Sequence, residues 1–441
     1  MNAITPRLCG NDALLAAARA VIAGGGSSNM RNLGIQDPLV VDRAMGARLW
    51  DVEGNELIDV NMGYGPHLFG YADAEVVGAV SERLRLGAMT GIIHRLDPQA
   101  GELISALMPS VEQVRFANSG TEAITSAIRL ARFHTDRTLV VTFEGHYHGW
   151  SDTLLRGAIT AGSTGQHGRT ELHAAPGTNP EALWHTVQLP WNDTDALTRF
   201  FADRGAEVAA VICEPICANA GVVHPLPGFL AQLAQLAADN GALVVFDEVI
   251  TGFRVSRGGA QELLGIRPDI SIISKVLGGG FPVAAFGASR EIMNPLARNE
   301  AFHGGVYSGN HAAVQAVVSM LGKIQRSPSV YTDLEESCSH LEKKLRDSFA
   351  EAGRHVRIAR AGSVMSVAVL SGPQTGLEAY DAAMDAIDFA AHRRFQGHCQ
   401  RGGLYFHPNP LEPWFLSSAH SREDMDRIVD VVALGLRALA E

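Results

Sequence analysis

Two stretches, Ala242-Leu-Val-Val-Phe-Asp247-Glu248 and Ile272-Ile-Ser274-Lys275-Val-Leu-Gly278-Gly-Gly280, decide the fold of this chain. The first is a short apolar run that ends in acids, and the second is an apolar run followed by a lysine and three glycines. Runs of this kind are typical of buried parallel strands, and ligands of open α/β sheets bind outside the carboxyl ends of such strands. The two stretches therefore predict a site at which Asp247 and the amine of Lys275 face one ligand.

The composition is that of an ordinary globular protein. The chain has 441 residues, of which 46% are hydrophobic, enough for two or three domains with a large buried core. A net charge of −11 without any basic run argues against a nucleic-acid or anionic-membrane partner and favours small molecules. Five scattered cysteines do not resemble a disulfide framework, and neither a leader-like N-terminus nor a membrane-spanning stretch is evident. We therefore expect a cytoplasmic protein.

Helical patterns alternate with short apolar runs between about residues 74 and 320. The runs occupy residues 113–117, 138–143, 208–213, 242–246 and 270–273. Because they are apolar on both faces and separated by helices, they predict an α/β domain with a covered, mostly parallel sheet.

The two ends of the chain follow a different pattern. A short helix over residues 11–25 precedes antiparallel strands around the turn Glu53-Gly54-Asn55. Beyond residue 320, a long polar helix over 333–350, a strand over 363–370 and a helix from Arg422 indicate an α+β lobe. We expect an N-terminal segment (1–65) that joins the small domain, a large domain (66–320) and a C-terminal small domain (321–441).

A small-residue turn, Asn118-Ser119-Gly120-Thr121, leads from a predicted strand into a helix. The free N–H groups and the positive dipole end of such a helix suit a phosphate, so Ser119, Gly120 and Thr121 are candidate phosphate ligands. The alternative is that Thr121 only caps the helix.

The next two strand ends carry an aromatic ring and an amide. Tyr147, between glycines in Glu144-Gly-His-Tyr-His-Gly149, could stack on a planar ligand, and Asn219 follows the strand that ends at Glu214. The His146-x-His148 pair also suggests a metal, but a third ligand is not evident, so we expect structural histidines and no metal site.

Together these strand ends fit pyridoxal phosphate. Its aldehyde needs an amine for a Schiff base, which Lys275 offers, and its ring nitrogen needs an anion, which Asp247 offers. The aspartate and lysine alone would be weak evidence, because such residues are common at strand ends. A phosphate turn, an aromatic ring and an amide at neighbouring strand ends make the prediction much stronger.

Five motifs resemble, in order and spacing, those of the class III (fold type I) pyridoxal phosphate-dependent aminotransferases. They are 118–123, 144–149, 246–254, Ser274-Lys275-x2-Gly-Gly-Gly-x-Pro282 and Ser308-Gly-Asn310. Within that class the chain is most similar to glutamate-1-semialdehyde 2,1-aminomutase and its relatives. The resemblance implies a large domain with a mostly parallel seven-stranded sheet, a smaller α+β domain, and a homodimer with active sites at the interface.

The resemblance also implies a role for each matching residue. Lys275 would be the Schiff-base lysine and proton shuttle, Asp247 the partner of the pyridine nitrogen, and Tyr147 the residue on the ring face. The remaining cofactor contacts would be Ser119, Gly120, Thr121, His148, Asn219, Val249, Gly305 and Val306. Aminomutases usually have threonine where this chain has Val306, so this contact would need a backbone N–H of Gly305 or Val306, or a water, if it exists at all.

Substrate contacts are implied at Arg31, Tyr64, Trp150, Phe302 and Glu412. Arg31 matches the arginine that holds a substrate carboxylate in the aminomutases, although a solvated loop arginine and an exposed Glu412 are the simpler readings. The chain departs from the aminomutases at Tyr64-Gly65-Pro66, at 70–74, at 87–94 and at Phe302-His303. We therefore expect an aminotransferase for another small carboxylate-bearing substrate, acting through a Lys275 Schiff base and pyridoxamine phosphate. The alternatives are intramolecular transfer, as in the aminomutases, and a non-catalytic pyridoxal phosphate-binding protein.

Overall fold

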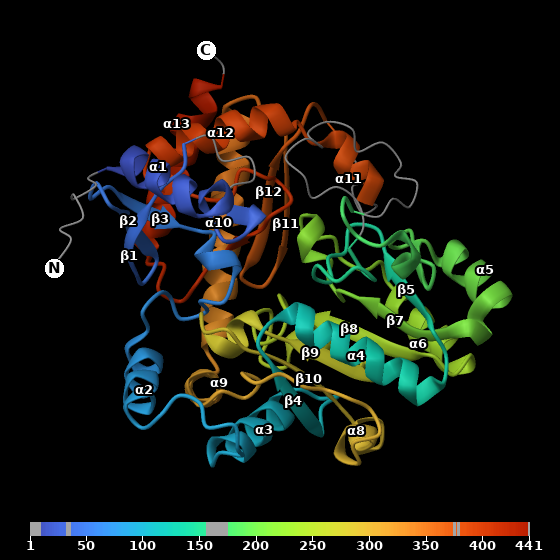
Figure 1. Ribbon diagram of the computed structural model, residues 1–441. Coiled ribbons are helices and arrows are strands. Elements are labelled where there is room, and N and C mark those ends of the chain that lie inside the picture. Colours follow the sequence, from blue (N-terminus) through green and yellow to red (C-terminus); the bar gives the residue numbers. More distant parts are fainter. Residues whose placement is uncertain (1–9, 32–36, 156–174, 374–375, 377–379, 440–441) are drawn as a thin grey trace.

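The computed structural model describes residues 10–31, 37–155, 175–373, 376 and 380–439. Its centre is a seven-stranded sheet in the order β4-β10-β9-β8-β7-β5-β6 (Figure 1). The strands are β4 (Gln113–Ala117), β5 (Leu139–Phe143), β6 (Thr186–Leu189), β7 (Val208–Cys213), β8 (Leu243–Glu248), β9 (Ile270–Ile273) and β10 (Ala284–Ala288). Only β10 runs against its neighbours, so the prediction of a mostly parallel seven-stranded sheet is confirmed.

The sequence patterns did not locate two of these strands. β6 is a sheet edge with a mixed burial pattern, and β10 is Ala-Ala-Phe-Gly-Ala, which has little intrinsic strand preference. β10 exists because its small residues fit a crowded place: a β-carbon at Gly287 would lie 2.7 Å from Val111 and 2.8 Å from the Gln113 carbonyl oxygen. Tertiary packing therefore decides this strand.

Helices cover both faces of the sheet. Alternate strand residues face α4 (Gly120–Thr135) and α8 (Arg290–Ala297) on one side, and α5 (Thr194–Arg204) and α6 (Phe229–Asp239) on the other. Three further helices, α2 (Ala74–Arg85), α3 (Leu96–Leu107) and α9 (His311–Arg326), share a core with β9 and β10. The sheet is thereby buried on both faces, as its apolar runs require.

The two ends of the chain form a second body of structure together (Figure 1). The β-hairpin of β2 (Arg48–Asp51) and β3 (Glu56–Asp59) was predicted correctly, and β13 (Leu404–Tyr405) pairs with β3 in parallel. The remaining α-helices and strands of the described residues are α1 (Asn11–Val21), β1 (Val41–Met45), α7 (Gly259–Leu264), α10 (Val330–Glu351), β11 (Val356–Ala361), β12 (Val364–Val369), α11 (Tyr380–Ala386), α12 (Phe389–Arg401), β14 (Trp414–Phe415) and α13 (Arg422–Ala438). Division at residues 65 and 320 stays a prediction.

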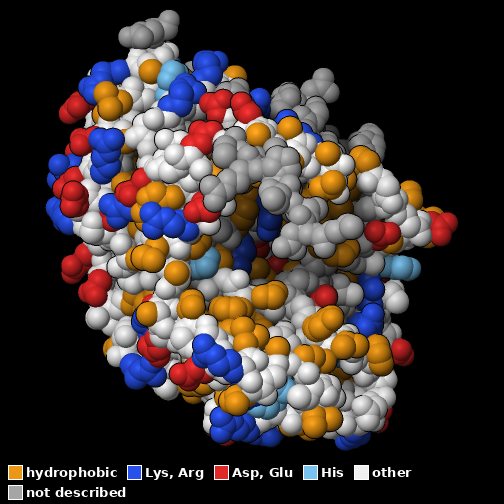
Figure 2. Space-filling view, turned by 60° about the vertical axis from the view of Figure 1, so that its left-hand side comes forward, with side chains coloured by type: hydrophobic (Ala, Val, Ile, Leu, Met, Phe, Trp, Pro, Cys, Tyr) orange, Lys and Arg blue, Asp and Glu red, His pale blue; other side chains and the backbone are white. Residues whose placement is uncertain are grey.

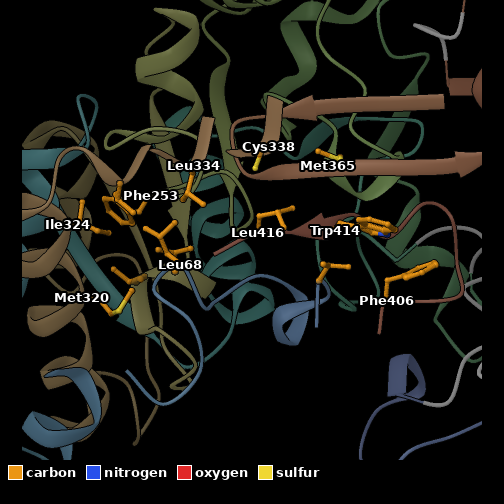
Figure 3. Close-up of a cluster of buried hydrophobic side chains, with 14 of the residues drawn as sticks. Leu68, Phe253, Met320, Ile324, Leu334, Cys338, Met365, Phe406, Trp414 and Leu416 are labelled. Atoms are coloured by element: carbon orange, nitrogen blue, oxygen red, sulfur yellow. The ribbon is translucent and has the colours of Figure 1, made fainter. Parts of the chain in front are cut away.

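One hydrophobic core joins the two bodies. Figure 3 shows it extending from Met320 and Ile324 of α9, past Leu68, to Trp414 and Phe406. Arg254 adds polar links, since its guanidinium, 1% exposed, donates to the carbonyl oxygens of Gly65 at 2.5 Å and Leu416 at 2.7 Å. Burial lowers the pKa of Arg254 to about 10. The arginine thus holds Gly65, and with it the segment that carries Tyr64, against the large domain.

Candidate active site

The parallel strands β5, β7, β8 and β9 are neighbours in the sheet, so their carboxyl ends lie side by side at one edge. Tyr147, Asn219, Asp247 and Lys275 all follow or end these strands. Figure 2 shows a hollow in one face of the molecule with acidic and basic side chains inside it. The strand ends that the sequence singled out are therefore brought together by the sheet order.

Asp247 is fixed by two hydrogen bonds. It is 4% exposed, one carboxylate oxygen lies 2.8 Å from His148 Nδ1, and the other accepts the Val249 N–H at 3.1 Å. An ionised carboxylate only accepts hydrogen bonds, so Nδ1 of His148 carries a proton. This arrangement holds a buried anion in one orientation, as a partner for a pyridinium nitrogen requires.

Lys275 opens the 3-10 turn Lys275–Gly278 with φ of 47°, a left-handed conformation that is strained for a residue other than glycine. Burial lowers the pKa of its amine, while the negative charges of Glu412, Glu214 and Asp247 oppose that shift. The ammonium nitrogen lies 5.9 Å from the centre of the Phe415 ring. The amine therefore stands in a partly desolvated place that three carboxylates surround.

Glu214 organises the backbone around this amine. It is 3% exposed and accepts the N–H groups of Tyr147 at 2.9 Å, Ala218 at 2.9 Å and Asn219 at 3.2 Å. Burial raises the pKa of Glu214, and the charge of Asp247 raises it further. The candidate list from the sequence omits Glu214, although its position at the end of an apolar run is the same signal that identified Asp247.

His146, Glu214 and Cys217 form a cluster whose candidate ligand atoms lie within 4.8 Å of one another, whereas His148 contacts Asp247 instead. The Glu214 N–H donates to His146 Nδ1 at 2.9 Å, so the neutral ring carries its proton on Nε2. The Glu214 oxygens already accept three backbone N–H groups. These bonds already use His146 Nδ1 and both carboxylate oxygens of Glu214, so we assign no metal to this cluster.

The turn before α4 has the geometry of an anion cradle. Ser119, and not Thr121, caps the helix, because its hydroxyl accepts the Glu122 N–H at 3.3 Å. A β-carbon at Gly120 would lie 3.1 Å from Val249, and one at Gly149 would overlap the hydroxyl of Thr121. Glycine is therefore required at position 149 and fits best at position 120. The first-turn N–H groups, which lack intrahelical acceptors, remain for a phosphate.

The loop with Gly305 and Val306 lies beside this turn. A β-carbon on Gly305 would be 3.9 Å from the Asn118 side-chain nitrogen, and Arg129 donates to the Phe302 carbonyl oxygen at 3.1 Å. Val306 is 75% exposed and Phe302 76% exposed. Both side chains are therefore largely uncovered in the single chain, and their predicted contacts stay predictions.

The other predicted substrate residues divide into two groups. The first group is Tyr64 with Arg31 and Glu412: the Tyr64 hydroxyl donates to the carbonyl oxygen of Met30, the residue before Arg31, at 2.7 Å. Burial and the charge of Glu412 raise the pKa of Tyr64, and the charge of Arg31 lowers it. Glu412 also faces Lys275, whose charge partly offsets the rise that burial causes in the Glu412 pKa. The second group is Trp150 alone, which is 68% exposed in the single chain.

Comparison with known proteins identifies the family. The family described as aminotransferase class-III matches residues 31–432. This protein is a class III aminotransferase family member. Glutamate-1-semialdehyde 2,1-aminomutase of Desulforudis audaxviator is 40% identical over 424 residues, which cover 95% of each chain. An omega-transaminase from Sphaerobacter thermophilus superposes with a TM-score of 0.90 at 29% identity over 100% of each chain. The predicted family and fold type I architecture are thus confirmed.

A third comparison bears on the fold alone. A glutamate-1-semialdehyde-aminomutase from Pseudomonas aeruginosa PAO1, solved as a variant in complex with PMP, has a TM-score of 0.86 at 22% identity over 97% of this chain and 94% of that one.

The cofactor of this class III family member is pyridoxal phosphate, as predicted. The residues fit it: Asp247 is a fixed buried anion, Lys275 a partly desolvated amine, and Gly120 leaves a space that a β-carbon would narrow. The ring of Tyr147 is 38% exposed, which leaves it partly uncovered, as a stacking surface must be. Among the described residues, no helix combines the length and apolar character of a membrane crossing.

Proposed function

We propose that this enzyme moves an amino group within one small carboxylate-bearing substrate, as the glutamate-1-semialdehyde 2,1-aminomutases do. The observation that carries the proposal is the 40% identity with such an enzyme over 95% of both chains. The comparisons support this alternative better than our first expectation, an aminotransferase with two substrates.

Each site residue has a separate role in the proposed reaction. Pyridoxal phosphate, when bound, supplies a carbonyl that captures amines and a ring that accepts electrons from the substrate carbon. Lys275 offers the amine that holds the cofactor and then moves a proton at the substrate, and its lowered pKa makes the neutral amine available at a lower pH than in an ordinary lysine. The carboxylate of Asp247 would stabilise the protonated ring nitrogen, and Ser119, Gly120 and Thr121 would bind the phosphate.

The substrate wall would be built from Arg31, Tyr64 and Glu412. A guanidinium suits a substrate carboxylate, and Glu412, close to Lys275, suits an amine or a hydroxyl. Arg31 is exposed, so a substrate carboxylate can reach it from solvent.

Transfer between two substrates is the second candidate. It is favoured by the similarity to the omega-transaminase, and by the substitutions at Tyr64 and at 87–94, where the chain departs from the aminomutases. The two reactions share the cofactor and the lysine and differ in whether a second carbonyl compound is needed.

Supplying glutamate-1-semialdehyde alone to the purified holoenzyme tests the proposal. We expect many turnovers to the isomer in which the amine has moved to the neighbouring carbon, measured by chromatography, without any second substrate. Conversion that stops at about one equivalent per site and resumes when pyruvate is added would instead establish the aminotransferase. No conversion in either case, with an unchanged cofactor spectrum across a panel of amines, would favour the non-catalytic binding protein.

We also propose that the enzyme is a cytoplasmic homodimer. The four described cysteines are free and buried, which suits a reducing compartment. Large apolar side chains lie exposed on two neighbouring loops, Ile92 (76%) and Ile93 (91%) on one and Val306 and Tyr307 on the other. The loops are joined where the His311 N–H donates to the Ala88 carbonyl oxygen at 2.8 Å. Exposed apolar patches of this kind mark protein interfaces.

A charge placed in this patch is expected to separate the subunits. The Ile93→Asp variant should fold normally, because Ile93 is exposed in the single chain. Its association should weaken, because burial of a carboxylate at an interface is unfavourable. Light scattering should give twice the chain mass for the wild type and a shift toward one chain mass for the variant. The control is Leu434→Asp, which changes an exposed leucine of α13. A monomeric wild type would contradict the dimer.

A further inference from the structure

Two side chains that are far apart in sequence meet at the backbone of Met30, the residue before Arg31. The Tyr64 hydroxyl donates to the Met30 carbonyl oxygen at 2.7 Å. The ring of His407 lies 5.8 Å from the Tyr64 ring, centre to centre, and the Met30 backbone acts on His407 as a hydrogen-bond acceptor does. The turn Asn29–Arg31 is only three residues long, so contacts from outside must hold it.

His407 stands at this place as a neutral donor. It is 2% exposed, and burial lowers its pKa to about 4, so the ring carries no charge at neutral pH. The Asn409 N–H donates to Nδ1 at 3.1 Å, which leaves the ring proton on Nε2. Within the described residues, Nε2 forms no hydrogen bond of normal geometry, although it is buried. A buried donor of this kind needs an acceptor, and the Met30 carbonyl oxygen, which the neighbouring Tyr64 hydroxyl bonds, is the candidate.

The backbone is strained to place Tyr64 here. Its φ is 66°, which is rare for an aromatic residue, and the flanking Gly63 and Gly65 have φ of 62° and 98°. Gly65 cannot be replaced easily, since a β-carbon there would lie 2.6 Å from the Phe415 ring. Strain that the surrounding structure maintains is characteristic of functional sites.

We propose that Tyr64 and His407 are positioning residues that hold the Met30 carbonyl and thereby aim Arg31 at the substrate carboxylate. Arg31 directly follows Met30 in the turn that the Tyr64 hydroxyl bonds, and its charge lowers the pKa of Tyr64. The inference rests on the proposed function in one respect only, that the substrate carries a carboxylate. In the proposed enzyme these two residues would set carboxylate affinity without touching the reacting atoms.

Equilibrium binding tests the proposal independently of turnover. Calorimetry would measure the affinity of the holoenzyme for succinate and for its neutral counterpart succinamide. Loss of one hydrogen bond in Tyr64→Phe should weaken succinate binding about three- to tenfold, with succinamide unchanged. His407→Gln provides a second variant, with the same expected direction. Tyr71→Phe is the matched control, because its hydroxyl bonds to Asp59 at 2.6 Å and not to the Arg31 turn.

A double-mutant cycle shows whether the effect passes through Arg31. If it does, Tyr64→Phe should weaken succinate binding in the wild type but cause no further loss in an Arg31→Ala background. An equal loss in both backgrounds, unchanged affinity in Tyr64→Phe, or no succinate binding by the wild type would overturn the proposal. Failure of the aminomutase assay would leave these affinities unaffected, so the two hypotheses can fail separately.

Discussion

Replacing Lys275 by alanine is expected to reduce turnover by about 10⁴-fold or more, because the variant loses both the amine that holds the cofactor and the group that moves the proton. The fold should persist. Alanine has the same β-carbon as lysine, so the strain at φ of 47° is unchanged, and removing a partly desolvated amine leaves no unpaired cation. Turnover measured with wild-type and variant enzyme gives the rate loss, and circular dichroism checks the fold.

Borohydride reduction offers a second measurement of the same variant. Reduction of a covalent link between cofactor and lysine adds the cofactor mass permanently to that lysine. The chain has few lysines, so peptide mass mapping can identify the labelled one without ambiguity. We expect the label on Lys275 in the wild type and none in Lys275→Ala. Lys343→Ala, which changes an exposed lysine of α10, should label and turn over normally. A variant that turns over at the wild-type rate would contradict the role of Lys275.

Sequence reasoning located β4, β5, β7, β8 and β9 of the large sheet and missed β6 and β10. The apolar runs that became β7 and β8 are buried along their full length, so periodicity and composition identify them. β10 is buried along its full length as well, but Ala-Ala-Phe-Gly-Ala contains no β-branched residue, and at Gly287 a β-carbon would lie 2.7 Å from Val111. Its place between β4 and β9 could not be derived from local preference.

In the site, too, local sequence signals identified some residues, whereas the roles of others depend on tertiary contacts. Asp247 and Lys275 were predictable because the end of a parallel strand is a known location for ligands. Glu214 was overlooked, although its carboxylate accepts the N–H groups that orient Tyr147 and Asn219. The proposed role of His407 could not be read from the sequence, since it depends on the neighbouring ring of Tyr64, 343 positions away along the chain (407 − 64).

Asp247→Asn is expected to lower turnover by about 10²- to 10³-fold while leaving cofactor binding largely intact. An amide retains the size of the carboxylate and one acceptor oxygen for Val249, but it carries no charge to keep the ring nitrogen protonated. His148 would then face an amide, and Nδ1 can accept from its NH₂ group if the ring proton moves to Nε2, which has no partner among the described residues. The fold should therefore tolerate the change. The predicted signature is a reduced rate with a shifted visible absorbance of the bound cofactor.

Glu248→Gln is the matched control for this variant. Glu248 is the next residue of β8 and is fully buried, but its carboxylate accepts from Thr251, Ala260 and Gln261 and not from His148. Loss of its charge should lower the unfolding temperature without shifting the cofactor spectrum. If both variants lower the rate only in proportion to their loss of folded protein, Asp247 is a structural residue. A spectral shift and rate loss confined to Asp247→Asn would instead support a role of its charge at the ring nitrogen, because the charge of Asp247, unlike that of Glu248, acts on the amine of Lys275.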